Sequence, residues 1–357
     1  MTAIRTVSGL AAAGLVRDDR LADLEKVAAR YAVAITPGLA DLIDPSDAED
    51  PIARQFVPDA HELAIAPNEN ADPIGDHAHT PVDGIVHRYP DRVLLKLVST
   101  CAVYCRFCFR REMVGPGRGG LSRKALAAAL DYIRAMPDIW EVILTGGDPL
   151  ILSARRLQEV VAQLAAIDHV KVIRVHTRLP VAAPERVTAA LVRALRSDKA
   201  AFVVLHANHP RELTPAVGAA IARFVDAGIP MLSQSVLLRG VNDEVETLGA
   251  LMRALVECRV KPYYLHHADL APGTSHLRTT IADGQGLLRA LHGRYSGLCQ
   301  PAYVLDIPGG HGKSPIGPNY LSTDASSVED FNGRRHVYPT AAPNGQAASA
   351  KNTAVSN

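Results

Sequence analysis

The stretch Val93-Leu-Leu-Lys-Leu-Val98-Ser-Thr-Cys101-Ala-Val-Tyr-Cys105-Arg-Phe-Cys108 joins an apolar run to three closely spaced cysteines. The run from Val93 to Val98 has strand length and is almost continuously apolar, which is typical of a strand buried on both faces. Three residues separate the first two cysteines, and two separate the second pair. We therefore expect the cysteine loop to lie at the C-terminal end of a buried strand.

The spacing of the cysteines predicts an iron–sulfur cluster. Thiolates are soft ligands that suit iron–sulfur clusters or zinc. A four-iron cluster held by Cys101, Cys105 and Cys108 keeps one iron without a protein ligand, whereas a structural zinc ion normally has four protein ligands. Zinc, or three reduced structural thiols, are the alternatives. The run also resembles the radical S-adenosylmethionine (SAM) signature, including the aromatic Phe107 before the last cysteine.

Segments of helical and strand length alternate after the cysteine loop. The expected helices are 122–136, 153–167, 184–196, 214–227 and 244–257, and the expected strands are 140–145, 171–176, 201–206, 231–237 and 262–266. With the strand at 93–98 they make six β/α units. This alternation predicts an α/β fold with a parallel sheet and outer helices. We expect a partial (β/α)6 TIM-like barrel rather than a closed barrel of eight strands.

Unusual polar residues stand where the expected strands end, and functional residues of such folds gather at the C-terminal ends of strands. These residues are Cys101, Gly146, His176, His206, Gln234 and His266.

Composition narrows the range of partners and compartments. The chain has 38 basic and 37 acidic residues, so its net charge gives no reason to expect nucleic acid or an anionic membrane as a partner. No apolar stretch has the length of a membrane span. The five cysteines do not form a disulfide pattern, and low-potential iron–sulfur chemistry needs a reducing compartment. We expect a cytoplasmic protein.

A glycine-rich turn, Asp306-Ile-Pro-Gly-Gly-His-Gly-Lys313, follows a strand-like run near the C-terminal end. Its spacing differs from that of a nucleotide-binding P-loop, and Pro315 prevents the helix that such a loop needs. A lysine carried on glycines reaches into a cavity and forms a Schiff base where desolvation keeps its amine neutral. From the residues alone, the pattern favours an exposed surface lysine at Lys313 over a Schiff-base lysine.

Several motifs together resemble the lysine 2,3-aminomutase family, including its branch that supplies β-lysine for modification of elongation factor P. They are HRYPDRVLLKL, LTGGDPL, NHPRELT, SQSVLLRGVND and PGGHGK. The resemblance extends from about residue 50 to about residue 338. It implies a 4Fe–4S cluster, SAM and pyridoxal 5'-phosphate (PLP), with PLP carried by Lys313 as the catalytic lysine.

The resemblance also assigns cofactor-binding roles. The methionine part of SAM is expected near Gly146, Gly147 and Asp148, and an ordinary turn after a strand is the alternative for these three residues. Phe107 belongs to the same site as part of the signature. The other cofactor-binding positions are His206 and Gln234 for SAM and the reactive centre, and Arg88 and Tyr89 for the PLP phosphate.

Three further residues are expected to define the substrate. By the resemblance, Arg110 binds its carboxylate, while Asp269 and Asp306 bind the distal ammonium group of lysine. A pair of buried carboxylates disfavours an acidic side chain, so glutamate is not the expected substrate. The expected reaction moves the α-amino group of L-lysine to the β-carbon through a PLP aldimine and a 5'-deoxyadenosyl radical. The alternatives are the same chemistry on arginine or another amino acid, or a non-catalytic iron–sulfur or zinc protein.

These inferences predict four parts of the chain. Residues 1–83 form an N-terminal helical and irregular extension, with a helix from Arg17 to Tyr31, and residues 84–300 form the radical SAM partial barrel. Residues 301–340 hold the PLP lysine and a terminal hairpin at Phe331-Asn-Gly-Arg334, and residues 341–357 form a disordered tail. The expected partners are free lysine, a reducing electron donor and a second copy of the chain in a homodimer.

Overall fold

The computed structural model describes residues 3–115 and 119–338. These residues form two compact units, one within Met1–Gly317 and one within Pro318–Asn357. The domain boundaries expected after residues 83 and 300 both fall within the first unit and stay predictions. The predicted tail, residues 341–357, lies outside the described residues. No helix in the described ranges is both long enough and apolar enough to cross a membrane.

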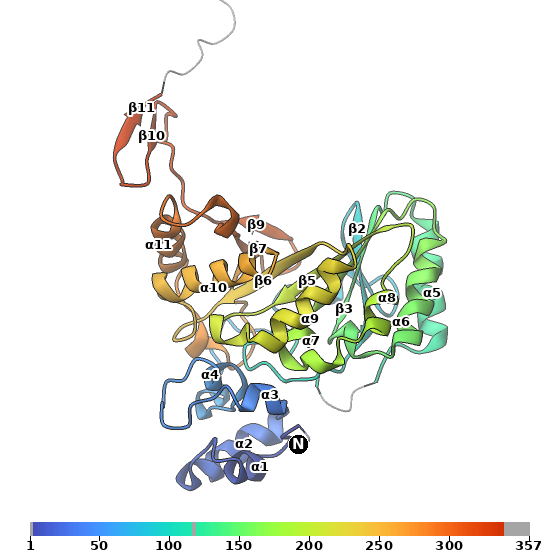
Figure 1. The fold of residues 1–357 in the computed structure, drawn as a ribbon, viewed down its shortest axis with the longest axis horizontal. Coiled ribbons are helices and arrows are strands. Elements are labelled where there is room, and N and C mark those ends of the chain that lie inside the picture. Colours follow the sequence, from blue (N-terminus) through green and yellow to red (C-terminus); the bar gives the residue numbers. More distant parts are fainter. Residues whose placement is uncertain (1–2, 116–118, 339–357) are drawn as a thin grey trace, which may run out of the picture. The chain divides into compact units, whose positions relative to one another are not determined.

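The first unit is built on a sheet whose strands follow one another in sequence order (Figure 1). β2 to β8 pair in parallel, while β1 and β9 pair antiparallel at the two ends. Because each parallel strand is added beside the previous one, the sheet curls in one direction as a partial barrel. The strands are β1 Ile85–Tyr89, β2 Arg92–Val98, β3 Glu141–Gly146, β4 Val172–Thr177, β5 Ala200–His206, β6 Met231–Leu237, β7 Val260–His267, β8 Ala302–Asp306 and β9 Lys313–Pro315.

The α/β partial barrel predicted from sequence is therefore confirmed, with differences at its two edges. All six expected parallel strands are present, and β8 adds a seventh strand parallel to β7. The antiparallel edge strands β1 and β9 were not expected. β9 has only three residues, too few for an apolar period to be recognised.

Helices of the barrel cover the outer face of the sheet (Figure 1). α6 shows why: Leu157, Val160, Val161 and Leu164 form one buried stripe at helical spacing. The helices of the first unit are α1 Val7–Ala12, α2 Leu21–Arg30, α3 Pro37–Ala40, α4 Ala53–Phe56, α5 Arg123–Ala135, α6 Ala154–Ala165, α7 Leu179–Ala182, α8 Ala189–Arg193, α9 Pro215–Asp226, α10 Val245–Glu257 and α11 Ile281–Leu291. Short 3-10 turns link several of them, as at Asp18–Arg20 before α2.

One expected helix, residues 184–196, was wrong as a continuous element. The segment contains a 3-10 turn at Pro184–Arg186 and then the short helix α8. Thr188 is the N-cap of α8, because its side-chain oxygen accepts a hydrogen bond from the backbone N–H of Leu191. A new helix therefore begins after Thr188.

Strand alternation directs side chains into the interior of the barrel. Along β6, alternate residues are buried against neighbouring structure, while Leu232, Gln234 and Val236 point to the other face and line a cavity. On β4, Arg174 and His176 line the same cavity.

The two edge strands meet beside the cavity. The backbone N–H of Lys313, the first residue of β9, donates to Tyr89 Oη over 2.6 Å at the end of β1. Nearby, a Cβ added to Gly75 would lie 2.4 Å from the backbone nitrogen of Gly310, so these two backbones pack at a distance that only glycine permits. The contact brings the glycine-rich turn to the edge of the sheet that starts the barrel.

The second unit contains a small hairpin of β10 Ser327–Glu329 and β11 Arg335–Val337. Its turn includes Gly333 with a φ of 78°, a conformation that suits glycine. The hairpin predicted from Asn-Gly at this position is confirmed.

Candidate functional site

A cavity of about 930 Å³ occupies the interior of the partial barrel. Every site residue predicted from sequence lines it, although these residues come from segments up to 225 positions apart, counted from Arg88 to Lys313 (313 − 88). The predicted residues that the cavity brings together are Arg88, Tyr89, Cys101, Cys105, Phe107, Cys108, Arg110, Gly146, Gly147, Asp148, His206, Gln234, Asp269, Asp306 and Lys313.

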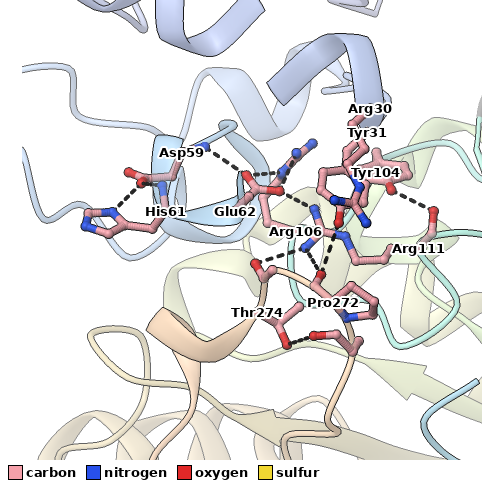
Figure 2. A network of polar contacts seen from close by, with 12 residues as sticks. Arg30, Tyr31, Asp59, His61, Glu62, Tyr104, Arg106, Arg111, Pro272 and Thr274 are labelled. Atoms are coloured by element: carbon pink, nitrogen blue, oxygen red, sulfur yellow. Dashed lines mark hydrogen bonds and ion pairs between the residues drawn. The ribbon is translucent and has the colours of Figure 1, made fainter. Parts of the chain in front are cut away.

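Two buried arginines anchor the cysteine loop to the N-terminal segment. Arg106 donates from Nε to Glu62 Oε1 over 2.9 Å, and Arg111 pairs with the other oxygen of the same carboxylate. Figure 2 shows this network, in which Glu62 is fully buried. Removing one partner of a buried pair leaves an uncompensated charge. The network therefore fixes the loop that carries Cys105 and Cys108.

The three thiols lie in an environment that favours their neutral form. Burial raises the pKa of each thiol, and that of Cys108 to about 11. Metals bind the thiolate, so a metal group must supply the positive charge that ionises these sulfurs. Among the described residues, no three Cys, His, Asp or Glu side chains are already gathered at metal-ligand spacing. The three residues therefore fit an iron–sulfur cluster because their donor atoms are sulfurs and because they line the same cavity.

The glycines after β3 pack against the strand that leads to the cysteines. A Cβ on Gly146 or Gly147 would lie 2.3 Å from the carbonyl oxygen of Val98 or Thr100. These glycines are required by the packing of backbone on backbone. Their expected role in SAM binding stays a prediction.

Asp148 makes its hydrogen bonds within the protein. Its carboxylate accepts from the Thr177 hydroxyl and from the backbone N–H groups of Leu150 and Arg178, at 2.8 to 3.0 Å. The carboxylate thus joins the ends of β3 and β4. Its expected contact with the SAM ammonium group stays a prediction.

Two histidines present unpaired polar atoms to the cavity. The Nε2 atoms of His176 and His206 are buried and have no hydrogen-bond partner among the described residues. Burial lowers the pKa of both imidazoles well below its usual value, so both rings are neutral. The His206 ring centroid lies 5.5 Å from that of Phe107. Since buried polar atoms normally find a partner, these atoms suit a polar ligand.

Lys313 forms an ion pair with a predicted substrate residue. Its Nζ lies 2.8 Å from Asp306 Oδ1, and His266 Nδ1 lies 3.5 Å from the other oxygen. Burial alone would raise the pKa of Asp306, but the hydrogen bond from His266 and the charge of Lys313 outweigh it and hold the pKa below its usual range. Asp306 is therefore ionised.

Asp269 differs from Asp306 in having no cation of its own. Within the described part of the chain, its carboxylate has no hydrogen-bond or ion-pair partner. Burial and the negative charge of Asp306 raise the pKa of Asp269 to about 8. Once Asp269 ionises, both carboxylates are negatively charged, and Lys313 balances the charge of only one of them.

Asp76 joins two arginines that were expected to bind different ligands. Its Oδ1 accepts from Arg88 Nη2 over 3.0 Å, and its Oδ2 accepts from Arg110 Nε and Nη2 over 3.1 and 2.8 Å. Burial would raise the pKa of Asp76, but Arg110, Lys96 and Arg88 hold it low. One ionised carboxylate thus orients both guanidinium groups.

Sequence reasoning missed several residues of the site. Asp76 lies in a connector rich in Pro, Asp and Asn, where a carboxylate is expected to form turns. Arg178 and the pair Arg174–Glu141 carried no recognisable motif. The positions of His176 and His266 at strand ends gave a signal, but no role had been assigned to either residue.

Comparison with known proteins identifies the family. Residues 95–251 match the Radical SAM superfamily, and residues 288–354 match the family described as Lysine-2,3-aminomutase. The chain is 41% identical to the L-lysine 2,3-aminomutase of Clostridium subterminale over 304 residues, which cover 84% of this chain and 73% of that protein. The chain belongs to the lysine 2,3-aminomutase family. The predicted family and enzyme class, an aminomutase, are thereby confirmed.

Other members of the lysine 2,3-aminomutase family differ in their named substrates. The L-lysine 2,3-aminomutase of Acetoanaerobium sticklandii is 42% identical, over 81% of this chain and 70% of that protein. The glutamate 2,3-aminomutase of Clostridioides difficile is 35% identical, over 87% and 74% respectively. Membership implies a 4Fe–4S cluster and SAM as cofactors and is consistent with PLP. The substrate class is a free amino acid.

Proposed function

We propose that this chain is an L-lysine 2,3-aminomutase, which moves the α-amino group of lysine to its β-carbon. The observation that carries the proposal is the single cavity lined both by the three cysteines and by Lys313 with two aspartates. A radical enzyme needs its metal group and its substrate in one closed space, because misplacement of the reacting atoms removes the benefit of proximity.

The charges around Lys313 support a cationic substrate. When Lys313 is engaged by a carbonyl cofactor, Asp306 loses the closer of its cationic partners and keeps Arg88, whose Nη1 lies 3.9 Å from Oδ1. Asp269 has no ion-pair partner among the described residues. A second ammonium group on the substrate would compensate these carboxylates. Glutamate would instead add a third negative charge, and like charges at close range are costly in a buried site.

The proposal gives each predicted residue a task. Lys313 would carry PLP, and Arg88 with Tyr89 would hold the PLP phosphate, since an arginine fork matches phosphate geometry. Arg110 would bind the substrate carboxylate, and Asp76 would hold both arginines in place.

The cofactors and the protein would divide the work. When bound, the cluster and SAM supply a radical that removes hydrogen from the substrate, and PLP supplies a ring that delocalises the unpaired electron while nitrogen migrates. The apolar lining, including Val86, Ile143 and Val236, would exclude water from the reaction. Cys101, Cys105 and Cys108 would hold the cluster, with Phe107, His206 and Gln234 beside SAM.

The proposal extends to the setting of the enzyme. All five cysteines are free thiols, which supports a reducing compartment such as the cytoplasm. An external electron donor of low potential would reduce the cluster, and two copies of the chain would form a homodimer. The predicted parts 1–83, 84–300 and 301–340 belong to the same proposal.

An anaerobic turnover assay tests the proposed function. The full chain, reconstituted with iron, sulfide and PLP and reduced with dithionite in the presence of SAM, should convert L-lysine to β-lysine. The variant K313A should lose PLP absorbance and turnover but keep the absorbance of the cluster. The control K171A changes an exposed lysine whose Nζ contacts the Asp168 carbonyl, and it should remain active. Absence of β-lysine from a wild-type protein with full iron content and bound SAM would contradict the proposal.

A further inference from the structure

Arg178 follows β4 and reaches the cysteine loop. Its Nη1 donates a hydrogen bond to Cys105 Sγ over 3.3 Å. The side chain is buried, with 7% of its surface exposed, and it lines the cavity. A charged donor thus touches the sulfur of a predicted cluster ligand.

Other buried groups hold the Arg178 guanidinium in this position. Nη2 donates to Gln55 Oε1 over 2.7 Å and pairs with Glu212 Oε2. The second oxygen of Glu212 accepts from the backbone N–H groups of Asn208 and His209, each over 2.9 Å. Gln55 and Glu212 are themselves fully buried. Because both partners of Nη2 are fixed, Nη1 remains directed at the sulfur.

Backbone and aromatic contacts complete the support. The Arg178 N–H donates to Asp148 Oδ2 over 2.8 Å. The guanidinium carbon lies 4.6 Å from the ring centroid of Phe56 and 5.5 Å from that of Phe107, distances at which a cation is attracted to an aromatic ring. Four separate segments of the chain therefore converge on one arginine beside Cys105.

A hydrogen bond to a ligand sulfur changes the reduction potential of an iron–sulfur cluster. The reduced cluster carries one more negative charge than the oxidised cluster, so a cationic donor stabilises the reduced form more. We propose that Arg178 raises the reduction potential of the cluster by donating a hydrogen bond to the Cys105 sulfur. The step concerned is the transfer of one electron from an external one-electron reductant to the 4Fe–4S cluster in its 2+ state, which gives the 1+ state.

Arg178 is thus a positioning residue that acts through a cluster ligand. The inference rests on the cluster assignment and is independent of which amino acid is the substrate.

A redox titration of the reconstituted full chain tests the inference. The midpoint potential is measured by electron paramagnetic resonance with dithionite as reductant, without SAM or amino acid. R178M should shift the midpoint to more negative values, and R178K, which keeps a donor and the charge, should lie closer to wild type. The control is R134M: Arg134 is an exposed arginine of α5, away from the cavity, and it pairs with Asp131 over 2.7 Å. Its midpoint should equal that of wild type.

A second variant distinguishes an effect on the midpoint potential from a loss of folding. R178M leaves the Glu212 carboxylate buried without its arginine, whereas R178M/E212Q removes that charge and should still show the negative shift. A wild-type midpoint in either variant, at equal iron and sulfide content, would overturn the inference. Weaker SAM binding with an unchanged midpoint would likewise overturn it and assign Arg178 to SAM instead. Because the titration contains no amino acid, failure of lysine turnover leaves its result unaffected.

Discussion

Two regions of the molecule differ in how their buried charges are balanced. The cysteine region consists of the loop 101–108 and the ends of β3 to β5. There Glu62 pairs with Arg106 and Arg111, and Glu212 pairs with Arg178. In the lysine region, formed by the ends of β7 and β8 and the start of β9, the charges are unequal. Lys313 balances Asp306, while Asp269 has no partner among the described residues. In the first region the protein itself balances the charges of its buried carboxylates, whereas in the second region a ligand must balance the charge of Asp269 once it ionises.

The substitution C108A should break the cysteine region and have the largest effect. A cluster with two remaining thiolates should not be retained, so iron content and turnover should fall to background. PLP absorbance should persist, because Lys313 belongs to the other region. Retention of four irons per chain in this variant would contradict the ligand assignment.

The substitution D269N should weaken the lysine region alone. Hydrogen bonds to charged groups contribute about 1.5 to 3 kcal/mol, so kcat/KM for lysine should fall by about 10- to 150-fold. Iron content and SAM binding should be unchanged. The exposed control D131N should behave as wild type. A lysine kcat/KM within twofold of wild type in D269N would remove Asp269 from the substrate site.

The pH dependence of turnover should report the unbalanced charge. The pKa of Asp269 is raised to about 8, so below that pH the free enzyme holds a neutral acid, and above it a carboxylate that binds a cation. The kcat/KM for lysine should therefore rise with pH, about tenfold per unit below the midpoint, and level off above it. In D306N the midpoint should move to lower pH, because the neighbouring negative charge is lost. A profile identical in D306N would contradict this coupling.

Packing in the cysteine region should respond to a single methyl group. G147A places a Cβ 2.3 Å from the Thr100 carbonyl, and overpacking of this kind costs about 1 to 3 kcal/mol. Thermal unfolding should shift down by several degrees, measured by calorimetry. G286A is the control: this exposed glycine of α11 has open space around it, so alanine should be neutral or slightly stabilising. Equal midpoints for the two variants would show that the backbone contact at Gly147 is relaxed.

Most of the fold could be predicted from the sequence because the patterns that indicate its strands and helices are local. Strands such as β2, β3 and β5 are largely apolar runs of strand length, and such a run is recognisable without knowledge of its neighbours. The failure at 184–196 was also local in cause, since the cap at Thr188 divides an otherwise periodic segment. The resemblance to the family named the site residues, and the cavity includes all of them.

Contacts between distant segments could not be predicted. The hydrogen bond between Tyr89 and Lys313 joins residues 224 positions apart in the sequence. The hydrogen bond between Arg110 and Asp76 joins residues 34 positions apart. Nothing in the composition of either segment indicates its partner. Arg178 was missed for the same reason, because its role depends on Glu212, Gln55 and Cys105, which meet only in the folded chain.

A competition assay among amino acids tests whether one cavity combines radical chemistry with carboxylates that bind a second ammonium group. The reduced, reconstituted enzyme receives lysine, arginine, ornithine and glutamate at equal concentration, and the β-amino acids are quantified together. We expect β-lysine as the dominant product and no measurable β-glutamate. Formation of β-glutamate at a rate comparable to that of β-lysine would contradict the role assigned to Asp269 and Asp306.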